Sequence, residues 1–246
     1  MNKQLLIIGG GLAGTEAAWQ AAELGADVKL YEMRPKQQTP AHTTDNLAEL
    51  VCSNSMGSFL PHKAPGLLKA EMRGLGSMIL DCAEKTAVPA GSSLAVDRAT
   101  FSAAVNERIS THPRIELIRE EVTEIPRHQP AIIASGPLTS APLAQSIGAL
   151  TGEDHLYFYD ALSPIVEHDS INMDIAFRKS RYDKGEQDEG DYINCPMTEA
   201  EYDTFYNAVL KAETIVLREF ESEDAKFFEG CMPIEAMAKR GYKALA

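Results

Sequence analysis

Residues 5–14 read Leu5-Leu6-Ile7-Ile8-Gly9-Gly10-Gly11-Leu12-Ala13-Gly14, a short apolar run that meets a cluster of glycines. Gly9, Gly11 and Gly14 have the spacing G-x-G-x-x-G, and an alanine-rich segment of helical character follows to about Leu24. In this motif the first glycine permits a tight turn, the second lets backbone approach a pyrophosphate, and the third lets the helix pack closely on the strand. The pattern predicts a strand, a glycine turn and a helix whose first N–H groups face an anion.

A second apolar run, Val28 to Tyr31, ends on Glu32, which lies 18 positions after Gly14. A carboxylate at this distance accepts hydrogen bonds from the ribose hydroxyls of an adenine dinucleotide. A glycine turn in an arbitrary α/β domain would leave this acid unexplained, so we predict a dinucleotide site, although the motif does not separate FAD from NAD. The predicted cofactor-binding residues are Gly9, Gly10, Gly11, Leu12, Ala13, Gly14 and Glu32.

The composition sets limits on the class of protein. The chain has 246 residues and 44% hydrophobic residues, enough for one large domain or two modest ones. It has no apolar run of roughly 20 residues, so we expect no membrane span. Its N-terminal apolar run leads straight into the glycine turn, so we expect no signal peptide and a cytoplasmic protein. The net charge of −13 argues against bulk electrostatic binding of nucleic acid. An RNA would have to meet a local basic cluster, for which the candidates are Arg34, Lys36, Lys63, Lys69, Arg73, Lys239, Arg240 and Lys243.

The four cysteines are widely spaced: Cys52, Cys82, Cys195 and Cys231. They include no C-x-x-C pair and the six histidines are scattered, so we expect neither a metal site nor a disulfide framework. Cys52 lies among small polar residues and Cys231 in a turn-like setting, which leaves both a functional and a structural role open. Cys82 continues an apolar stripe, which favours a place in the core.

Several further elements follow from apolar spacing and capping residues. One helix is expected from Pro65 to about Cys82, with Leu68, Met72, Leu75 and Ile79 on its stripe. Another is expected after the N-cap Asp97, with Phe101, Val105 and Ile109 turned inward. Short strands are expected at residues 115–118 and 131–134, the latter leading to Gly136, in a loop of the kind that approaches a cofactor.

Near residue 160 the alternation of strands and helices ends, which predicts a domain over 1–160 and the beginning of another over 161–246. The charged, glycine-containing stretch 178–191 is expected to be a mobile loop. Thr198 and Glu201 predict a capping box for a helix whose aromatic stripe (Tyr202, Phe205, Tyr206) is expected to pack in a core.

With these residues in view, the chain resembles TrmFO, the family of folate- and FAD-dependent tRNA uracil-5 methyltransferases. The resemblance rests on residues 9–14 with Glu32, and on residues 50–55, 66–73, 96–98, 136–140 and 228–231. The segments around Cys52 and Cys231 favour this family over the related GidA/MnmG flavoproteins, which modify the wobble uridine of tRNA and share the glycine turn.

The resemblance implies a Rossmann-like FAD-binding domain of the GR2 type of flavoprotein, with FAD held by residues 9–14, Glu32 and Gly136. It implies transfer of a one-carbon unit from methylenetetrahydrofolate to C5 of a uridine in the T-arm of tRNA, giving 5-methyluridine. Reduced FAD supplies the electrons, and NAD(P)H re-reduces the flavin. Cys52 and Cys231 match the two implicated cysteines. Uracil C5 becomes nucleophilic only after a group adds to C6, for which a thiolate is suited. We expect Cys231 to attack C6 and Cys52 to accept the C5 proton, with the reverse assignment open.

Family members are longer than this sequence. The resemblance therefore implies that residues 161–246 begin an inserted domain that is cut short, and that the chain alone is inactive and binds FAD weakly or not at all. Two alternatives stay open beside this interpretation. One is an FAD/NAD(P)H oxidoreductase of a small molecule, and the other is a non-catalytic FAD-domain module that acts in binding or assembly.

Overall fold

The computed structural model describes residues 4–39, 41–51, 53–152, 166–180, 190–214 and 233–245. The chain divides into two compact units, Met1–Phe158 with Lys184–Glu186 and Tyr159–Asp183 with Gln187–Ala246. The predicted boundary near residue 160 falls on residues 153–165, outside the described ranges, and stays a prediction.

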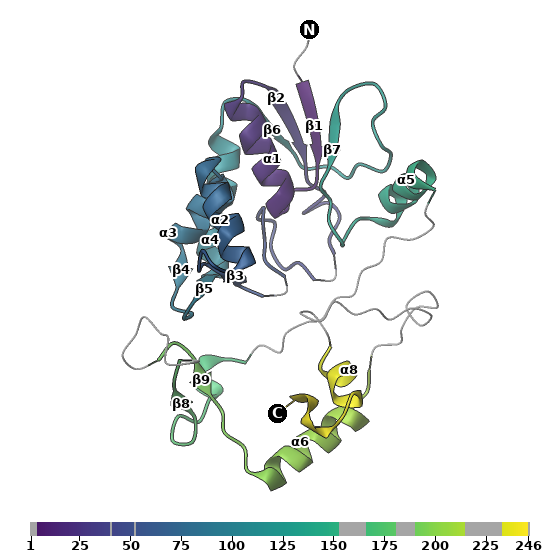
Figure 1. Cartoon of the computed structure of the whole chain (residues 1–246). Helices are drawn as coiled ribbons and strands as arrows, with labels where there is room; N and C mark the ends of the chain where they lie inside the picture. The colour runs from purple at the N-terminus through teal and green to yellow at the C-terminus, as the bar shows by residue number, and fades with distance from the viewer. Residues whose placement is uncertain are drawn as a thin grey trace. The chain divides into compact units, whose positions relative to one another are not determined.

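The first unit combines strands and helices along the chain (Figure 1). In order these are β1 (Gln4–Ile8), α1 (Leu12–Glu23), β2 (Asp27–Tyr31), β3 (Ser55–Ser58), α2 (Ala64–Gly74), α3 (Met78–Lys85), β4 (Ala87–Val88), β5 (Ser93–Val96), α4 (Arg98–Thr111), β6 (Ile115–Ile118), β7 (Ala131–Ile133) and α5 (Ala141–Thr151).

A four-stranded parallel sheet of order β6-β2-β1-β7 forms the centre of this unit. β1 pairs with β2 on one side (Leu5 opposite Val28) and with β7 on the other (Leu6 opposite Ala131). The central strand is apolar on both faces, as a buried parallel strand must be, and Leu6, Ile7 and Ile8 are each at most 5% exposed. The parallel sheet connected through α1 confirms the predicted α/β, Rossmann-like class.

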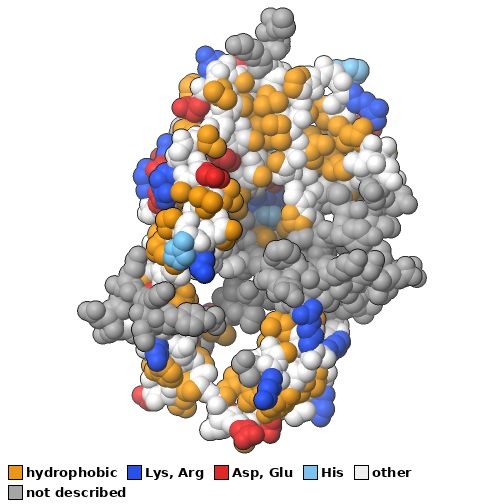
Figure 2. Space-filling view, viewed as in Figure 1, with side chains coloured by type: hydrophobic (Ala, Val, Ile, Leu, Met, Phe, Trp, Pro, Cys, Tyr) orange, Lys and Arg blue, Asp and Glu red, His pale blue; other side chains and the backbone are white. Residues whose placement is uncertain are grey.

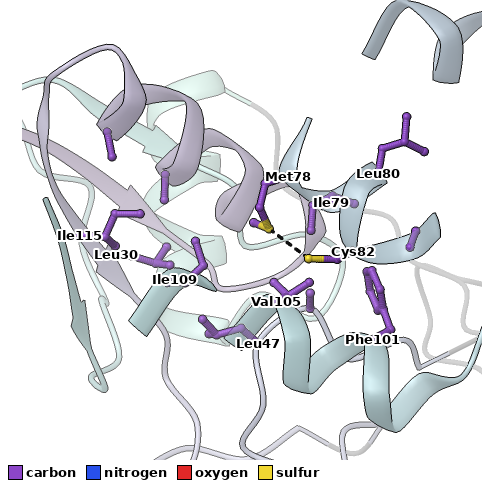
Figure 3. Close-up of a cluster of buried hydrophobic side chains, with 14 of the residues drawn as sticks. Leu30, Leu47, Met78, Ile79, Leu80, Cys82, Phe101, Val105, Ile109 and Ile115 are labelled. Carbon is purple, nitrogen blue, oxygen red and sulfur yellow. Dashed lines mark hydrogen bonds between the residues drawn. The ribbon is translucent and has the colours of Figure 1, made fainter. Parts of the chain in front are cut away.

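The helices on one side of the sheet supply most of the core (Figure 3). On α4, Phe101, Val105 and Ile109 are fully buried, and the Asp97 carboxylate accepts a hydrogen bond from the N–H of Thr100 at 2.9 Å. Both features confirm the predicted capped helix. Cys82 is 2% exposed and its thiol lies 3.7 Å from the sulfur of Met78, so its predicted place in the core is confirmed.

The prediction of one helix from Pro65 to Cys82 is wrong. The chain forms α2 and α3 instead, separated at Gly76, whose φ is +73°. Ser77 caps α3 through a hydrogen bond from the N–H of Leu80, and the Glu16 carboxylate of α1 accepts from the hydroxyl of Ser77 at 3.0 Å. Because the helix breaks here, the expected stripe is interrupted, and Leu75 is 77% exposed.

A second sheet is antiparallel and has the strand order β3-β5-β4. Its strand β3 contacts α2, and its strand β5 contacts α3. The first turn of α2 approaches the residues after β3 so closely that a Cβ on Gly66 would lie 1.9 Å from the carbonyl oxygen of Leu60. The buried ammonium group of Lys69 donates to the carbonyl oxygen of Met56 at 2.6 Å, and burial lowers the pKa of Lys69.

The described part of the second unit contains two short paired strands and three short helical segments besides α6. Their bounds are η1 (His168–Ser170), β8 (Phe177–Arg178), β9 (Ile193–Asn194), α6 (Glu199–Lys211), α8 (Ile234–Lys239) and η4 (Tyr242–Leu245). β8 and β9 are antiparallel. The predicted capping box at Thr198 and Glu201 is confirmed.

The aromatic stripe of α6 packs against α8 and η4. The rings of Tyr202 and Tyr206 lie 5.0 and 5.1 Å, centroid to centroid, from the ring of Tyr242. Tyr206 also donates a hydrogen bond to the carbonyl oxygen of Ala238. No residue of α6 is fully buried, so the stripe forms a half-exposed cluster rather than the expected core. Most of the predicted mobile loop, residues 181–189, lies outside the described residues.

Hydrophobic side chains are exposed on the face of the first unit where Figure 1 shows the strands (Figure 2). The edge strand β7 contributes to the exposed apolar surface of this unit, with Ile132 and Ile133 39% and 36% exposed. Within the described ranges, no helix has the length and apolar character needed to cross a membrane.

Candidate dinucleotide-binding site

The turn between β1 and α1 is tight enough to require glycine at two positions. Gly9 has φ +110°, and a Cβ on it would lie 2.5 Å from the carbonyl oxygen of Ala134, just after β7. A Cβ on Gly14 would lie 1.8 Å from the carbonyl oxygen of Gly9. The first and third glycines of the motif therefore have the conformational and packing roles that the spacing predicts.

The first turn of α1 presents exposed backbone N–H groups. The N-cap Gly11 makes no side-chain capping bond, and the first N–H groups of a helix have no partner within the helix. Gly11, Leu12 and Ala13 are all exposed, and no described atom lies within 4 Å of a Cβ built on Gly11. Free donors at the positive end of a helix attract an anion, so this turn is able to bind a pyrophosphate.

The carboxylate of Glu32 lies directly beside this turn. Its Oε2 accepts a hydrogen bond from the N–H of Gly10 at 2.9 Å, and the residue is 6% exposed. Its Oε1 accepts from both the N–H and the Nε of Arg34, each at 3.0 Å. Burial raises the pKa of Glu32, but the hydrogen bonds and charge of Arg34 and the Gly10 N–H together hold it below its usual value. Glu32 is therefore an ionised acceptor beside the glycine turn, and its contact with a ribose stays a prediction.

The end of β7 forms the other side of the turn. The N–H of Ala134 donates to the carbonyl oxygen of Ile8 at 2.7 Å, which continues the pairing of β7 with β1. Gly136, two residues later, has φ +65° and is exposed, and the hydroxyl of Thr139 donates to its carbonyl oxygen. The loop lies where the sequence predicts, and a contact between Gly136 and a cofactor stays a prediction.

Two predicted surface cations are buried instead. Arg34 is 2% exposed and is paired with Glu32 and, through Nη1 at 2.9 Å, with Glu49. Lys69 donates to three backbone carbonyl oxygens on and beside β3 and α2. Neither is available to bind RNA at the surface. The contacts of Arg34 with Glu32 and Glu49 were not predicted from the sequence, and the signal for the first of them is the arginine two positions after the predicted ribose carboxylate.

The two predicted catalytic cysteines, Cys52 and Cys231, both lie outside the described residues. Two positions after Cys52, the side chain of Asn54 donates a hydrogen bond to the carbonyl oxygen of Val96 on β5. Cys195 is exposed and makes no disulfide. Among the described residues, no group of three or more His, Cys, Asp or Glu side chains could hold a metal ion.

Fold and site together define a class of protein: a Rossmann-like α/β domain with a phosphate-binding glycine turn and an acid at the end of the second strand, as in dinucleotide-binding proteins. The chain belongs to the family described as "Glucose inhibited division protein A", whose sequence profile matches residues 4–246.

Within known proteins, the chain is similar to enzymes named methylenetetrahydrofolate–tRNA-(uracil-5-)-methyltransferase TrmFO. It is 58% identical to that of Bacillus licheniformis over 245 residues and 59% identical to that of Bacillus subtilis over 246 residues. In both cases the match covers 100% of this chain and 55% of the relative, so the chain spans about half the length of the relatives. The resemblance to TrmFO is thereby confirmed. A solved structure of Aquifex aeolicus GidA is 20% identical, with a TM-score of 0.41 over 51% of this chain and 21% of that one.

Proposed function

We propose that the protein is a cytoplasmic flavoenzyme that transfers a one-carbon unit from methylenetetrahydrofolate to C5 of a uridine in tRNA. The observation that carries this proposal is the 58% identity, along the whole chain, to a relative named for this activity. The target within tRNA is taken to be the T-loop uridine, and the product 5-methyluridine.

The residues of the glycine turn fit FAD as the cofactor. The exposed N–H groups of the first turn of α1 suit its pyrophosphate, and Oε2 of Glu32 suits a ribose hydroxyl. Bound FAD, reduced by NAD(P)H, would supply the electrons that convert the transferred one-carbon unit into a methyl group. The protein's own contribution at this end is to bind the pyrophosphate at the first turn of α1 and to orient the ribose through Glu32.

Two thiols would perform the steps on the uracil. Addition of the Cys231 thiolate to C6 makes C5 nucleophilic, C5 bonds to the methylene carbon as its bond to the folate breaks, and Cys52 then accepts the proton that C5 loses. The Cys231 thiolate leaves C6 when the one-carbon unit is reduced to the methyl group. Cys82 is excluded from this role because it is 2% exposed and burial raises the pKa of its thiol.

The activity is tested in the full-length enzyme to which this chain belongs, with methylenetetrahydrofolate labelled in its methylene carbon, NADPH, FAD and an unmodified tRNA transcript. We expect labelled 5-methyluridine by mass spectrometry, and none from a transcript whose T-loop uridine is replaced by cytidine. Transfer from the folate to another nucleotide would refute the assigned target, and NADPH oxidation with no label in any tRNA would favour a small-molecule oxidoreductase.

Variants of the full-length enzyme divide the proposal into its parts. Cys52→Ala and Cys231→Ala should each abolish methylation and retain FAD, whereas Cys195→Ala, a matched control at an exposed free cysteine, should be fully active. Glu32→Ala should weaken FAD binding by at least about tenfold, since it removes a charged acceptor worth roughly 1.5–3 kcal/mol. Normal flavin affinity in that variant would exclude Glu32 from the site.

A further inference from the structure

A closed ring of contacts surrounds the predicted ribose carboxylate. Gly10 donates its N–H to Oε2 of Glu32, and Arg34 donates its Nε to Oε1 of the same carboxylate. Nη1 of Arg34 donates to Oε2 of Glu49 at 2.9 Å, and the N–H of Ala48 donates to the carbonyl oxygen of Gly10 at 2.8 Å. The ring therefore ties the glycine turn, the end of β2 and the loop that contains Ala48 and Glu49 into one structure.

The outer part of the ring is itself firmly held. The carboxylate of Glu49 accepts hydrogen bonds from the N–H and hydroxyl groups of both Thr43 and Thr44, at 2.9–3.1 Å. Nη1 of Arg34 also donates to the carbonyl oxygen of Thr44 at 3.0 Å. The guanidinium group is thus fixed from two sides, and its side chain is 2% exposed.

The arrangement leaves one oxygen of Glu32 able to accept more. Oε1 already receives two hydrogen bonds from Arg34, whereas the only described donor to Oε2 is the N–H of Gly10. A carboxylate oxygen accepts about two hydrogen bonds, so Oε2 retains one acceptor position. Because Arg34 holds Oε1, it also determines the direction in which Oε2 faces.

We propose that Arg34 is a positioning residue of the dinucleotide site, which fixes the Glu32 carboxylate so that Oε2 accepts a ribose hydroxyl, with Glu49 as the anchor of Arg34. This inference rests on the proposed function. An arginine near the end of the second strand can alternatively bind the 2′-phosphate of a phosphorylated dinucleotide. In this chain the guanidinium points inward to two carboxylates, so it acts through Glu32 and not on the ligand.

Charge gives a second consequence of the same contacts. Arg34 supplies the hydrogen bonds and charge that outweigh the effect of burial on the pKa of Glu32. The other charged or titratable groups that face this region are Arg119, His42 and Glu49, together with Asp45, which acts on Arg119. Arg119 directs its hydrogen bonds to the carbonyl oxygen of Arg34 and to Asn106. Without the Arg34 side chain, Glu32 loses a side-chain hydrogen bond and a neighbouring positive charge that lower its pKa and keeps only the N–H donors of residue 34 and Gly10, so it would take up a proton at a higher pH.

The test is calorimetric titration of ADP-ribose, which carries the adenosine ribose and the pyrophosphate, into the protein between pH 5.5 and 8. Wild-type affinity should be constant over this range. Arg34→Met should bind at least about tenfold more weakly at pH 6 and should lose further affinity as the pH falls. Arg34→Lys keeps the charge but loses the two-sided fork, so its affinity should be reduced yet independent of pH.

The matched control is Arg114→Met, which removes an exposed arginine paired with Asp27 in the same unit and should bind as wild type. If Arg34→Met does not fold, Arg34→Lys and Glu49→Gln carry the test, and each should weaken binding about threefold or more. If the wild-type protein binds ADP-ribose and the Arg34 and Glu49 variants bind it with the same affinity, the positioning role is refuted but the dinucleotide site is not. A full-length wild-type enzyme that binds neither ADP-ribose nor FAD would overturn the dinucleotide site, and this inference with it.

Discussion

Replacing Gly14 by alanine should destabilise the first unit, because the new methyl group has no space. A Cβ at this position would lie 1.8 Å from the backbone carbonyl oxygen of Gly9, where ordinary contact begins at 3.4 Å. The two groups would have to separate by about 1.6 Å, the difference of these distances, and neither is a flexible side chain. The helix α1 would move away from the turn, and its buried residues Thr15, Ala18 and Ala22 would lose packing.

Overpacking of this kind costs about 3 kcal/mol or more, and the better helix propensity of alanine offsets at most about 1 kcal/mol. The net loss of about 2 kcal/mol corresponds to a decrease in Tm of about 4–8 °C for a chain of this size. The assay is thermal unfolding followed by circular dichroism at 222 nm. Gly11→Ala is the matched control, since its φ is −76° and no described atom lies within 4 Å of the added Cβ.

Gly11→Ala should unfold within about 1 °C of wild type while binding ADP-ribose more weakly, because its methyl group would occupy the approach to the pyrophosphate. This pair of variants separates the two roles of the glycine motif. Equal Tm values for Gly14→Ala and Gly11→Ala would refute the argument that backbone contact, and not ligand binding, requires glycine at position 14.

Three further predictions concern other parts of the chain. Thr198→Ala removes the capping box of α6 and should destabilise this helix by about 1 kcal/mol, which would appear as roughly fivefold faster hydrogen exchange of the α6 amides. Thr204→Ala on the same helix is the control, and equal exchange rates in both variants would contradict the role of the cap. Burial raises the pKa of Glu49, but the hydrogen bonds from Thr43 and Thr44 lower it further, so the net pKa lies below 4.5. The stability that ionised Glu49 contributes is therefore present above pH 4.5 and is lost as the pH falls through the folded-state pKa. In urea unfolding, Glu49→Gln should lose less stability below pH 4.5 than wild type, and parallel curves would exclude this contribution. Alkylation of the native protein at pH 8 should modify Cys195 and leave Cys82 unmodified until unfolding, as measured by peptide mass spectrometry, because Cys82 is 2% exposed and burial raises its pKa.

The sequence predicted those features whose determinants lie close together in the chain. The glycine turn, the capped helix after Asp97 and the capping box at Thr198 each depend on residues within a few positions of one another, and the structure confirms all three. The parallel sheet could be predicted as a class because its strands alternate with helices. At the candidate site, the motif also predicted that Glu32 lies beside the glycine turn.

The features that were missed depend on residues far apart in the sequence. The break between α2 and α3 is stabilised by Glu16, which accepts a hydrogen bond from Ser77, 61 positions later. Arg34 looked like a surface cation, since nothing near it in the sequence showed that Glu49, 15 positions away, would pair with it in the interior. Lys69 was misinterpreted for the same reason, because its partners are backbone carbonyl oxygens that only the folded chain brings together.

The order of strands in the parallel sheet has a consequence for how the chain folds. In the pairing of β1 with β2, Gln4 lies opposite Asp27, 23 residues away in the sequence. In the pairing of β1 with β7, Leu6 lies opposite Ala131, 125 residues away. The longer loop costs about 1.5 kcal/mol more in closure entropy, so the β1–α1–β2 unit should form first and β7 should join late. During synthesis at about 5–20 residues per second, β7 emerges about 5–20 s after β2. For that interval the apolar strand β1 has one unpaired edge, and an unpaired apolar edge is where incorrect strand pairing can begin.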